Sequence, residues 1–323
     1  MPSDARLVLL DKNDVDALLL PGEVLQAVRE AFVLHSEGAG RVFPVVREAL
    51  VTGGIFGIKS GEVPGQGLLG FKAGGFWPTN RELGGEPHQA TVVLIDPANG
   101  RPACIIDGNA ITGARTGAAG GLGLVALARP DSTRLCVFGT GVQARAQLRF
   151  ALQLMPSLRQ VRYVTSDGAP DPVFESHFWG ECDIVCAADR NEAVQESDVV
   201  ITATPGKGAL FELSAVRPGT HFNCVGADTK GKRELPPGLL GRARLIVDDR
   251  IQARQIGEAQ WAPDQPCSEL GELLSGKLDA RRAATDITVF DMTGLALQDL
   301  TVARLVYDRA AAGRLGTTIP WPW

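Results

Sequence analysis

Short hydrophobic runs separated by turn residues fill the first third of the chain. Residues 7–10 form one such run, and Pro21 then begins a segment whose hydrophobic residues recur every three or four positions, which predicts a helix. The runs that follow are bounded by Gly and Pro and predict five strands, at residues 45–51, 55–60, 68–73, 91–96 and 103–107. We therefore expect a mostly β first domain with helices at its start.

Strand and helix patterns alternate in the rest of the chain. A Gly- and Ala-rich helix over residues 110–128 is followed by predicted strands at residues 135–138, 161–164, 183–186, 199–202, 222–225, 245–247 and 288–290. This alternation predicts an α/β fold class, with a Rossmann-type doubly wound parallel sheet and a second, mostly β domain. A closing helix over 297–311 is expected to return to the mostly β domain that the first third of the chain forms. We assign residues 1–113, completed by 300–323, to the mostly β domain and residues 114–299 to the Rossmann domain.

Composition narrows the choice of partners. A chain of 323 residues with 45% hydrophobic residues can fill two cores, and its net charge of -5 with interspersed Lys and Arg argues against a nucleic-acid partner. The six cysteines sit mostly in apolar runs, where they pack as small hydrophobic residues, and Cys182 and Cys186 have no second pair at ligand spacing, so no metal is expected. No signal segment or membrane-spanning run is recognised, and we expect a cytoplasmic protein without a membrane partner.

One glycine motif predicts a dinucleotide site. The segment Gly139-Thr140-Gly141-Val142-Gln143-Ala144 follows a predicted strand directly and begins an amphipathic helix over residues 143–154. Gly139 permits the tight turn, Gly141 lets the backbone approach a pyrophosphate, and Ala144 keeps the helix close to the sheet. The amides at the start of the helix face the phosphates. We therefore count residues 139–143, including Thr140, Val142 and Gln143, as binding a nicotinamide dinucleotide.

The end of the next strand selects between NAD and NADP. It reads Val164-Thr165-Ser166-Asp167, and no arginine follows. Asp167 can accept hydrogen bonds from the ribose hydroxyls, which favours NAD, whereas Thr165 and Ser166 can donate to a 2′-phosphate. Asp167-Gly168 also fits a simple turn. We assign Ser166 and Asp167 to the cofactor site and predict NAD, with NADP left open.

Three cationic side chains lie in segments whose other residues are expected to pack inside the protein. They are Arg47, Lys72 and Arg115. Each alone is compatible with a side chain whose head reaches water, or with an internal ion pair. Together, beside a dinucleotide domain, they indicate a pocket for a carboxylate, because Arg binds carboxylates with two parallel hydrogen bonds.

At this point the chain resembles the ornithine cyclodeaminase and mu-crystallin family over nearly its whole length. The matching segments agree in order and spacing: His88-Gln89-Ala90-Thr91-Val92, Asp107-Gly108-Asn109-Ala110-Ile111-Thr112 continuing to Arg115-Thr116, the glycine motif at 139–144, Val225-Gly226-Ala227-Asp228 followed by Glu234-Leu235, and Thr288-Val289-Phe290-Asp291 with Gly294 and Asp299.

The resemblance implies a homodimer. Its first domains, which bind substrate, join into a shared β structure, and each subunit has its active site in the cleft beside its Rossmann domain. By the same resemblance, Arg47 and Arg115 hold the substrate α-carboxylate. Lys72 contacts that carboxylate and the reacting nitrogen, and Asp228 is the acid or base. The further cofactor contacts that we assign are Thr91, Arg115, Thr116, Thr202 and Gly226.

The family resemblance also implies the reaction. Hydride passes between the α-carbon of an amino acid and C4 of nicotinamide through an imine. In a cyclodeaminase the side-chain amine then attacks, ammonia leaves and the hydride returns, whereas a dehydrogenase or imine reductase transfers the hydride once. The cofactor supplies the difficult chemistry, while Lys72 or Asp228 manages the proton.

The strand before Lys72 bears on the substrate. Cyclodeaminases carry a glutamate there, but this chain reads Phe56-Gly57-Ile58-Lys59-Ser60 and offers no acid. If Lys59 points inward, it favours a carboxylate side chain and repels ornithine, and Asn80 and Arg81 can add to such a site. If Lys59 lies solvated on a strand edge, it contributes nothing to selectivity.

These residues favour an imino-acid reductase, such as one that converts iminosuccinate to aspartate. Alanine dehydrogenase and cyclic ketimine reductase activities are close alternatives, and ornithine cyclodeaminase activity is the alternative that ranks after them. A small-molecule binder without catalysis is the alternative from another class. Mu-crystallin-like sequences have a serine at the position of Asp228, so the aspartate here favours catalysis.

Overall fold

Two compact units make up the chain. The computed structural model describes residues 5–279 and 283–321. The first unit consists of Met1–Arg115 and Leu295–Trp323, and the second of Thr116–Gly294. Within the described residues, no helix is both long enough and apolar enough to cross a membrane.

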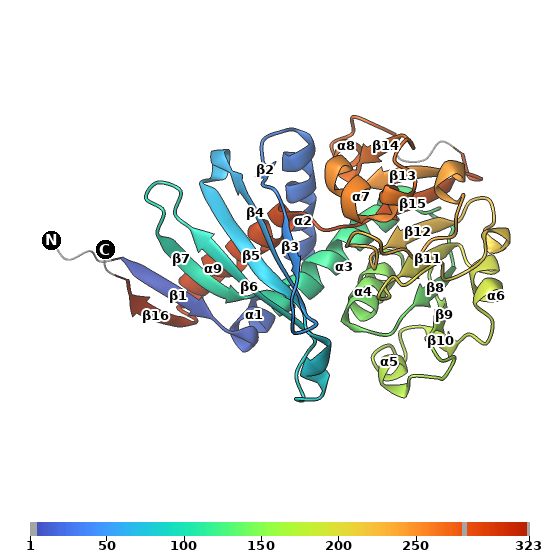
Figure 1. Ribbon diagram of the computed structural model, residues 1–323, viewed down its shortest axis with the longest axis horizontal. Helices are drawn as coiled ribbons and strands as arrows, with labels where there is room; N and C mark the ends of the chain where they lie inside the picture. The colour runs from blue at the N-terminus through green and yellow to red at the C-terminus, as the bar shows by residue number, and fades with distance from the viewer. Residues whose placement is uncertain (1–4, 280–282, 322–323) are drawn as a thin grey trace. The chain divides into compact units, whose positions relative to one another are not determined.

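The first unit is built on a mixed, mostly antiparallel sheet. Its strands follow the order β16-β1-β7-β6-β5-β4-β2, with β3 also paired to β4, and only the pair β1 and β7 is parallel (Figure 1). The bounds are β1 Arg6–Leu10, β2 Arg41–Val42, β3 Val46–Ala49, β4 Ile55–Val63, β5 Leu68–Phe76, β6 His88–Ile95, β7 Pro102–Asp107 and β16 Thr317–Pro320. Its helices include α1 Lys12–Leu18, α2 Pro21–Ser36 and α9 Ala296–Gly313.

Helix α9 packs on one face of this sheet, over β4, β5 and β6, with α2 against it (Figure 1). Two glycines permit this close approach. A Cβ at Gly61 would lie 3.2 Å from Leu297 Cδ2, and a Cβ at Gly70 would lie 2.9 Å from Leu300 Cδ2. Gly61 and Gly70 are directly paired across β4 and β5, so they share the face that α9 covers.

The second unit contains an all-parallel sheet. Its strand order is β10-β9-β8-β11-β12-β15-β13-β14. The strands are β8 Arg134–Phe138, β9 Gln160–Val164, β10 Asp183–Cys186, β11 Val199–Thr202, β12 His221–Cys224, β13 Ala243–Val247, β14 Cys267–Glu269 and β15 Ile287–Asp291. The helices are α4 Val142–Leu154, α5 Pro172–Ser176, α6 Arg190–Gln195, α7 Arg250–Ile256 and α8 Leu270–Leu274, and α3 Gly108–Leu127 continues from the first unit into the second.

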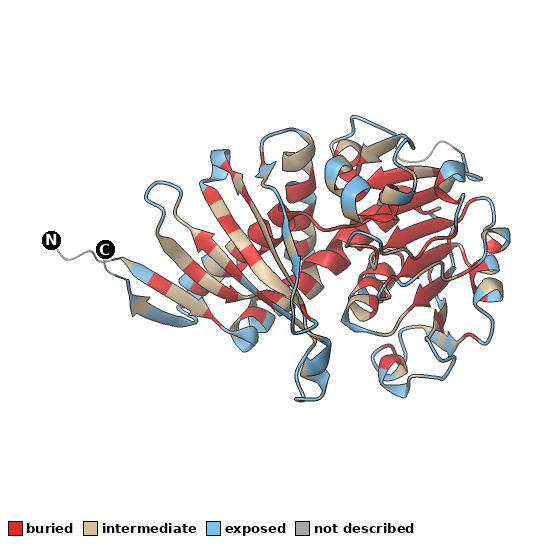
Figure 2. Cartoon of the chain, viewed as in Figure 1, coloured by how far each residue is buried: buried red, intermediate tan, exposed pale blue. Residues whose placement is uncertain are grey.

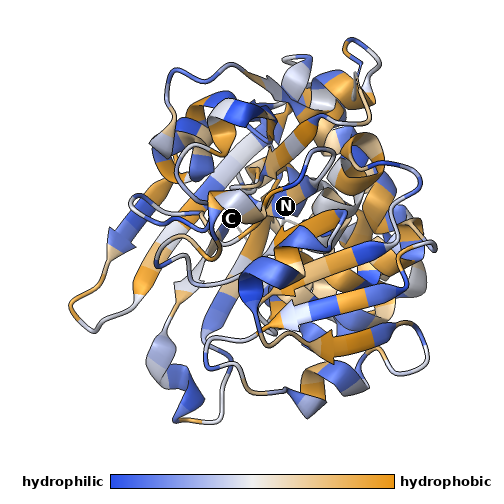
Figure 3. Cartoon of the chain, turned by 90° about the vertical axis from the view of Figure 1, so that its right-hand side faces the viewer, coloured by the Kyte–Doolittle hydropathy of each residue, from blue (hydrophilic) through white to orange (hydrophobic). Residues whose placement is uncertain are grey.

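Both faces of the parallel sheet are buried, as βαβ crossovers require. One core gathers around Phe138, Phe211 and Phe222, and the other around Leu148, Tyr163 and Phe174. The central strands β8, β11, β12, β13 and β15 are buried along most of their length (Figure 2). Hydrophobic segments are seen on several strands, and hydrophilic ones on many connecting loops (Figure 3).

The predicted fold class is confirmed, and the closing helix belongs to the first unit as expected. The assignment of substrate binding and dimerisation to that unit stays a prediction. Sequence patterns missed α1, β2, β14 and β16. These elements have between two and seven residues, which is too short for a helical or strand period to be recognised.

The contact between α9 and the sheet can be tested at Gly70. We expect Gly70→Ala to lower the free energy of unfolding by about 1–3 kcal/mol, because the added methyl group overpacks a buried contact. Its Cβ would lie 2.4 Å from Val93 O as well as against Leu300. Urea denaturation measures the loss. Gly65→Ala is the control, since a Cβ at Gly65 meets nothing within 4 Å, and equal stability of the two variants would contradict the prediction.

Candidate active site

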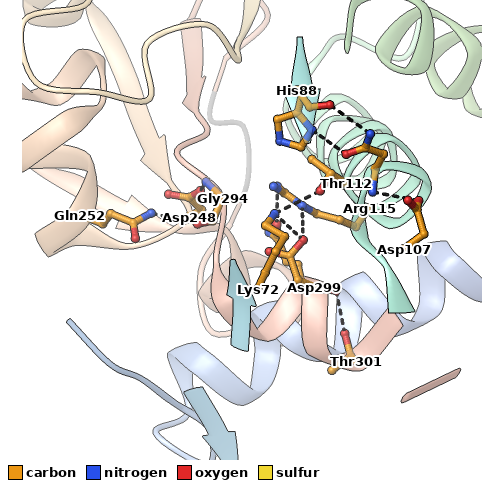
Figure 4. Close-up of polar contacts among 12 residues, drawn as sticks. Lys72, His88, Asp107, Thr112, Arg115, Asp248, Gln252, Gly294, Asp299 and Thr301 are labelled. Carbon is orange, nitrogen blue, oxygen red and sulfur yellow. Dashed lines mark hydrogen bonds and ion pairs between the residues drawn. The ribbon is translucent and has the colours of Figure 1, made fainter. Parts of the chain in front are cut away.

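A buried carboxylate joins two of the predicted cations in the first unit. Lys72 Nζ lies 2.8 Å from Asp299 Oδ1, and Arg115 Nε lies 3.0 Å from the same oxygen (Figure 4). All three side chains are at most 9% exposed. The residues come from β5, α9 and α3, so segments far apart in the sequence form one cluster.

The start of α3 orients two members of this cluster. Asp107 Oδ1 accepts hydrogen bonds from the backbone N–H groups of Asn109 and Ala110, which caps the helix. Thr112 and Arg115 are three residues apart and therefore share a helix face. Thr112 Oγ1 lies 3.2 Å from Lys72 Nζ, and Arg115 Nη1 donates to Gln298 Oε1 at 3.2 Å.

Burial makes the charge of Lys72 adjustable. Desolvation lowers the pKa of Lys72 to about 7, although Asp299 opposes this shift and Arg115 and Lys59 reinforce it. Burial alone would raise the pKa of Asp299, but Arg115 and Lys72 outweigh it and hold that pKa below the usual value. Asp299 therefore stays ionised, while Lys72 can gain or lose its proton near neutral pH. A carboxylate bound beside Lys72 would stabilise the protonated form.

Strand register brings Lys59 and Arg47 to the same face of the sheet. Lys59 is directly paired with Lys72, and Arg47 is paired with Gly57, two residues before Lys59. Side chains at paired positions point to the same face, as do those two residues apart in a strand. Strand β4 pairs with β5 on one side and with β2 and β3 on the other, and Lys59 lies between the β4 residues that pair with β2 and those that pair with β3. The role of Lys59 in a substrate pocket stays a prediction. Arg47 and Lys59 are half-buried.

His88 also faces this cluster, and its tautomer is fixed by Asn109. The Asn109 amide nitrogen donates to Glu86 Oε2 at 3.2 Å and to His88 O at 3.0 Å, so Asn109 Oδ1 must be the atom 3.1 Å from His88 Nδ1. His88 Nδ1 therefore carries the hydrogen, and Nε2 is an acceptor. Burial, together with Lys72, lowers the pKa of His88, which keeps the ring neutral.

The glycine motif of the second unit forms a helix start whose geometry suits an anion. Gly139 has φ of 97°, a conformation that favours glycine, and its Cβ would lie 2.6 Å from Ala203 O. Gly141 has open space around its Cβ position and is the N-cap of α4, and within the described residues no side-chain cap bonds to the first amides. These free amides and the helix dipole suit a pyrophosphate. Residues 139–143, the predicted motif, thus fit a dinucleotide.

Four further predicted cofactor residues lie at or just after the carboxyl ends of strands in the parallel sheet. Ser166 and Asp167 follow β9 and are exposed, and Asp167 Oδ1 accepts from Ala169 N at 3.1 Å in a turn. Thr202 ends β11, and Gly226 follows β12. Both of these donate to Glu234, as detailed below. The ribose contacts that we expect from Ser166 and Asp167 stay a prediction.

Asp228 lies in the loop after β12 with a cation of its own. Lys232 Nζ is 2.6 Å from Asp228 Oδ1, and Thr229 Oγ1 donates to the same oxygen at 3.1 Å. The Asp228 side chain is about one third exposed, at 34%, so its carboxylate can still be reached by a ligand.

Sequence reasoning gave no role to two residues that lie in or face the first cluster. The structure also places two of the predicted site residues away from that cluster. Asp299 and His88 were recognised as parts of matching segments but were given no role; an acid within the hydrophobic pattern of a helix was the available signal. Thr91 lies exposed on the sheet face opposite Lys72, since it pairs with Ala73 and Asp107. Thr116 O accepts from Gln147 Nε2 at 2.6 Å within the second unit.

Comparison with known proteins agrees with the resemblance seen in the sequence. The model of the "Ornithine cyclodeaminase/mu-crystallin family" matches residues 6–314. The chain is 31% identical over 315 residues to iminosuccinate reductase of Paracoccus denitrificans, covering 94% of this chain and 97% of that protein. It is 31% identical over 319 residues to alanine dehydrogenase of Archaeoglobus fulgidus, covering 97% and 98%.

A solved structure extends the match to the fold. An archaeal alanine dehydrogenase, described as a dimer with bound NAD, superposes with a TM-score of 0.92 at 30% identity and covers 98% of this chain and 99% of its own. The agreement therefore includes both units, the mixed sheet and the parallel one. This chain belongs to the ornithine cyclodeaminase/mu-crystallin family.

Proposed function

We propose that this protein is an NADH-dependent reductase of an α-imino acid with a second carboxylate, such as iminosuccinate, which it converts to the amino acid aspartate. The observation that carries the proposal is the register pairing of Lys59 with Lys72. Arg47 lies on the same face of the sheet, and Arg115 of α3 binds the Asp299 carboxylate beside Lys72, which adds two further cations. Several cations gathered around one site favour an anionic ligand, and a dianion can contact more of them than a monoanion can.

The coarser chemistry follows from family membership. The chain is an NAD(P)-dependent oxidoreductase that acts on amino or imino acids. Gly139, Gly141 and the free amides at the start of α4 would hold the dinucleotide pyrophosphate, and Ser166 and Asp167 its ribose. Bound NADH supplies the hydride for the imine carbon.

The residues of the chain would bind the substrate and supply a proton. Arg115 and Arg47 hold the α-carboxylate, and Lys72 contacts both that carboxylate and the imine nitrogen. Lys59 receives the side-chain carboxylate. Reduction of an imine consumes one hydride and one proton, and Lys72 in its protonated form, or Asp228, provides the proton to nitrogen. Ionised Asp299 keeps Lys72 and Arg115 in place throughout.

Two other substrate classes are compatible with the fold but less with the charges. Ornithine cyclodeaminase activity needs a pocket for a side-chain ammonium, and Lys59 would repel that group. Alanine dehydrogenase activity needs no cation at Lys59, although a relative of similar identity carries that name. The ionisable Asp228 favours an enzyme over a binder without catalysis.

We also propose that the protein forms a homodimer through the first unit. The face of its sheet opposite α9 carries hydrophobic residues that are only partly buried, namely Phe56, Ile58, Phe71, Val93, Ile95 and Ile105. A partner subunit would cover them. The archaeal alanine dehydrogenase described above is a dimer.

The proposed activity is tested by NADH oxidation, followed by absorbance. Purified protein is given ammonia with oxaloacetate, pyruvate or glyoxylate, and separately a cyclic imine. We expect oxidation with oxaloacetate and ammonia and much slower oxidation with the monocarboxylates. Ammonia released from ornithine with catalytic NAD, and no net NADH oxidation with any imine, would replace the proposal by cyclodeaminase activity.

The role of Lys59 predicts a selective loss. Lys59→Gln should raise the KM for the imine of oxaloacetate by about tenfold or more, because one charged hydrogen bond is lost, and leave the KM for the imine of pyruvate nearly unchanged. Lys59→Arg keeps the charge and serves as the matched control. Equal loss for both substrates would remove Lys59 from the pocket.

The lowered pKa of Lys72 predicts the pH dependence. With the imine concentration held constant, kcat/KM for reduction should fall as the pH rises through about 7, because neutral Lys72 can neither hold a carboxylate nor donate a proton. The fall in kcat should occur at higher pH, since the bound carboxylate stabilises the lysine cation.

Lys72→Arg provides the control for this assignment. Its guanidinium stays charged, so the fall near pH 7 should disappear even though the rate is lower. The same fall in the arginine variant, or a wild-type kcat/KM that increases through pH 7, would contradict the role of Lys72.

A further inference from the structure

Glu234 is a fully buried carboxylate in the second unit that accepts four hydrogen bonds. Thr204 N and Thr204 Oγ1 donate to Oε1 at 2.7 and 2.6 Å, and Thr202 Oγ1 and Gly226 N donate to Oε2 at 2.7 and 2.8 Å. Thr202 is the last residue of β11, Thr204 follows that strand, and Gly226 follows β12. Glu234 therefore ties the carboxyl ends of two neighbouring parallel strands together.

The distribution of these donors requires a carboxylate. Each oxygen of Glu234 accepts one backbone N–H, from Thr204 on one side and Gly226 on the other. A hydroxyl can rotate and become an acceptor, but a backbone N–H can only donate. Glutamine at this position would therefore set its NH₂ group against an N–H in either orientation. Burial raises the pKa of Glu234 above its usual value, although the hydrogen bonds from Thr202, Thr204 and Gly226 oppose the shift.

The loop that Glu234 closes carries Asp228. It runs from Gly226 to Glu234, and the carboxylate of its last residue returns to the backbone of its first. The ion pair of Asp228 with Lys232 lies between these two ends. The position of the Asp228 carboxylate thus depends on how this loop is closed.

A second element holds the same loop, through its backbone. Residues Glu258–Trp261 form a 3₁₀ turn in which Glu258 Oε1 accepts from Glu234 N at 2.5 Å and from Leu235 N at 3.2 Å. Gln260 Oε1 accepts from Gly231 N at 2.7 Å, and Trp261 Nε1 donates to Lys232 O at 2.8 Å. The loop is therefore fixed at both its start and its end, and Glu234 makes the bonds that reach the strand ends.

We propose that Glu234 is a positioning residue for the reaction. Its carboxylate sets the relative positions of Asp228 and of the Thr202 and Gly226 strand ends, where we predict cofactor contacts. This inference rests on the proposed function, because it concerns the same cofactor and the same acid or base. It predicts that loss of the carboxylate weakens NADH binding and lowers turnover more than it weakens binding of the imino acid.

The test compares Glu234→Gln with Asp198→Asn in the full-length protein. Asp198 is a matched control because it is also a largely buried carboxylate that accepts backbone N–H groups, from Thr133 and Arg134, and an Arg129 bond. It lies just before β11, at the opposite end of that strand from Thr202. Both variants should lose thermal stability.

The two variants should differ in function. For Glu234→Gln, NADH fluorescence titration should give a Kd raised by about tenfold or more, and kcat should fall by at least as much, because charged hydrogen bonds are lost. The KM for the imino acid, which depends on residues of the first unit, should change by no more than about twofold. Asp198→Asn should leave all three constants within about twofold of the wild type.

A NADH Kd and kcat for Glu234→Gln equal to those of Asp198→Asn would overturn the proposal and leave Glu234 with a structural role. If Glu234→Gln does not fold, Thr204→Val, which removes one hydroxyl donor and keeps the N–H, should raise the NADH Kd by roughly threefold or more. An unchanged Kd there would equally overturn it. If the wild type reduces no imine, the proposed function fails, while the NADH titrations still decide the role of Glu234.

Discussion

The ion pairs of Asp299 organise the first unit around one oxygen atom. Lys72 and Arg115 both bind Oδ1, and neither cation is solvated enough to do without it. Taking a charge out of water costs several kcal/mol unless a partner compensates it, and removal of one partner from a buried pair typically costs about 3–5 kcal/mol. The sheet, α3 and α9 are therefore held in mutual register by the same contact that keeps two cations available to a ligand. The Asp299 carboxylate therefore contributes both to the stability of the first unit and to the proposed ligand binding.

Sequence patterns predicted the fold class and most long elements, because long elements repeat the hydrophobic spacing of a helix or a strand. The helix expected over residues 297–311 is α9, and the strands at 183–186 and 199–202 have the expected bounds. The glycine motif was predictable for a different reason, since the tight turn between a strand and a helix requires glycine at positions such as 139 and 141. Local rules suffice for such features.

The parts that sequence reasoning could not supply depend on contacts between distant segments. Asp299 is 227 residues from Lys72, and no spacing rule relates them. Whether Lys59 points inward depended on the register of β4 against β5, and a shift of one residue would have turned it to the other face. Glu234 appeared only as part of a matching segment, because its four donors belong to residues 8 to 32 positions away, at or just after the ends of two strands.

The order of the elements along the chain has a consequence for biosynthesis. A ribosome makes most strands of the first sheet early, the second unit next, and α9 with Asp299 only after that unit. Until then, Lys72 and Arg115 lack the carboxylate of Asp299, and the sheet lacks the helix that covers β4, β5 and β6. Strand β16, which pairs with β1, is made later still. The second unit can fold as it emerges, since domains fold as units during synthesis, but the cation cluster of the first unit is completed only after the second unit has been made.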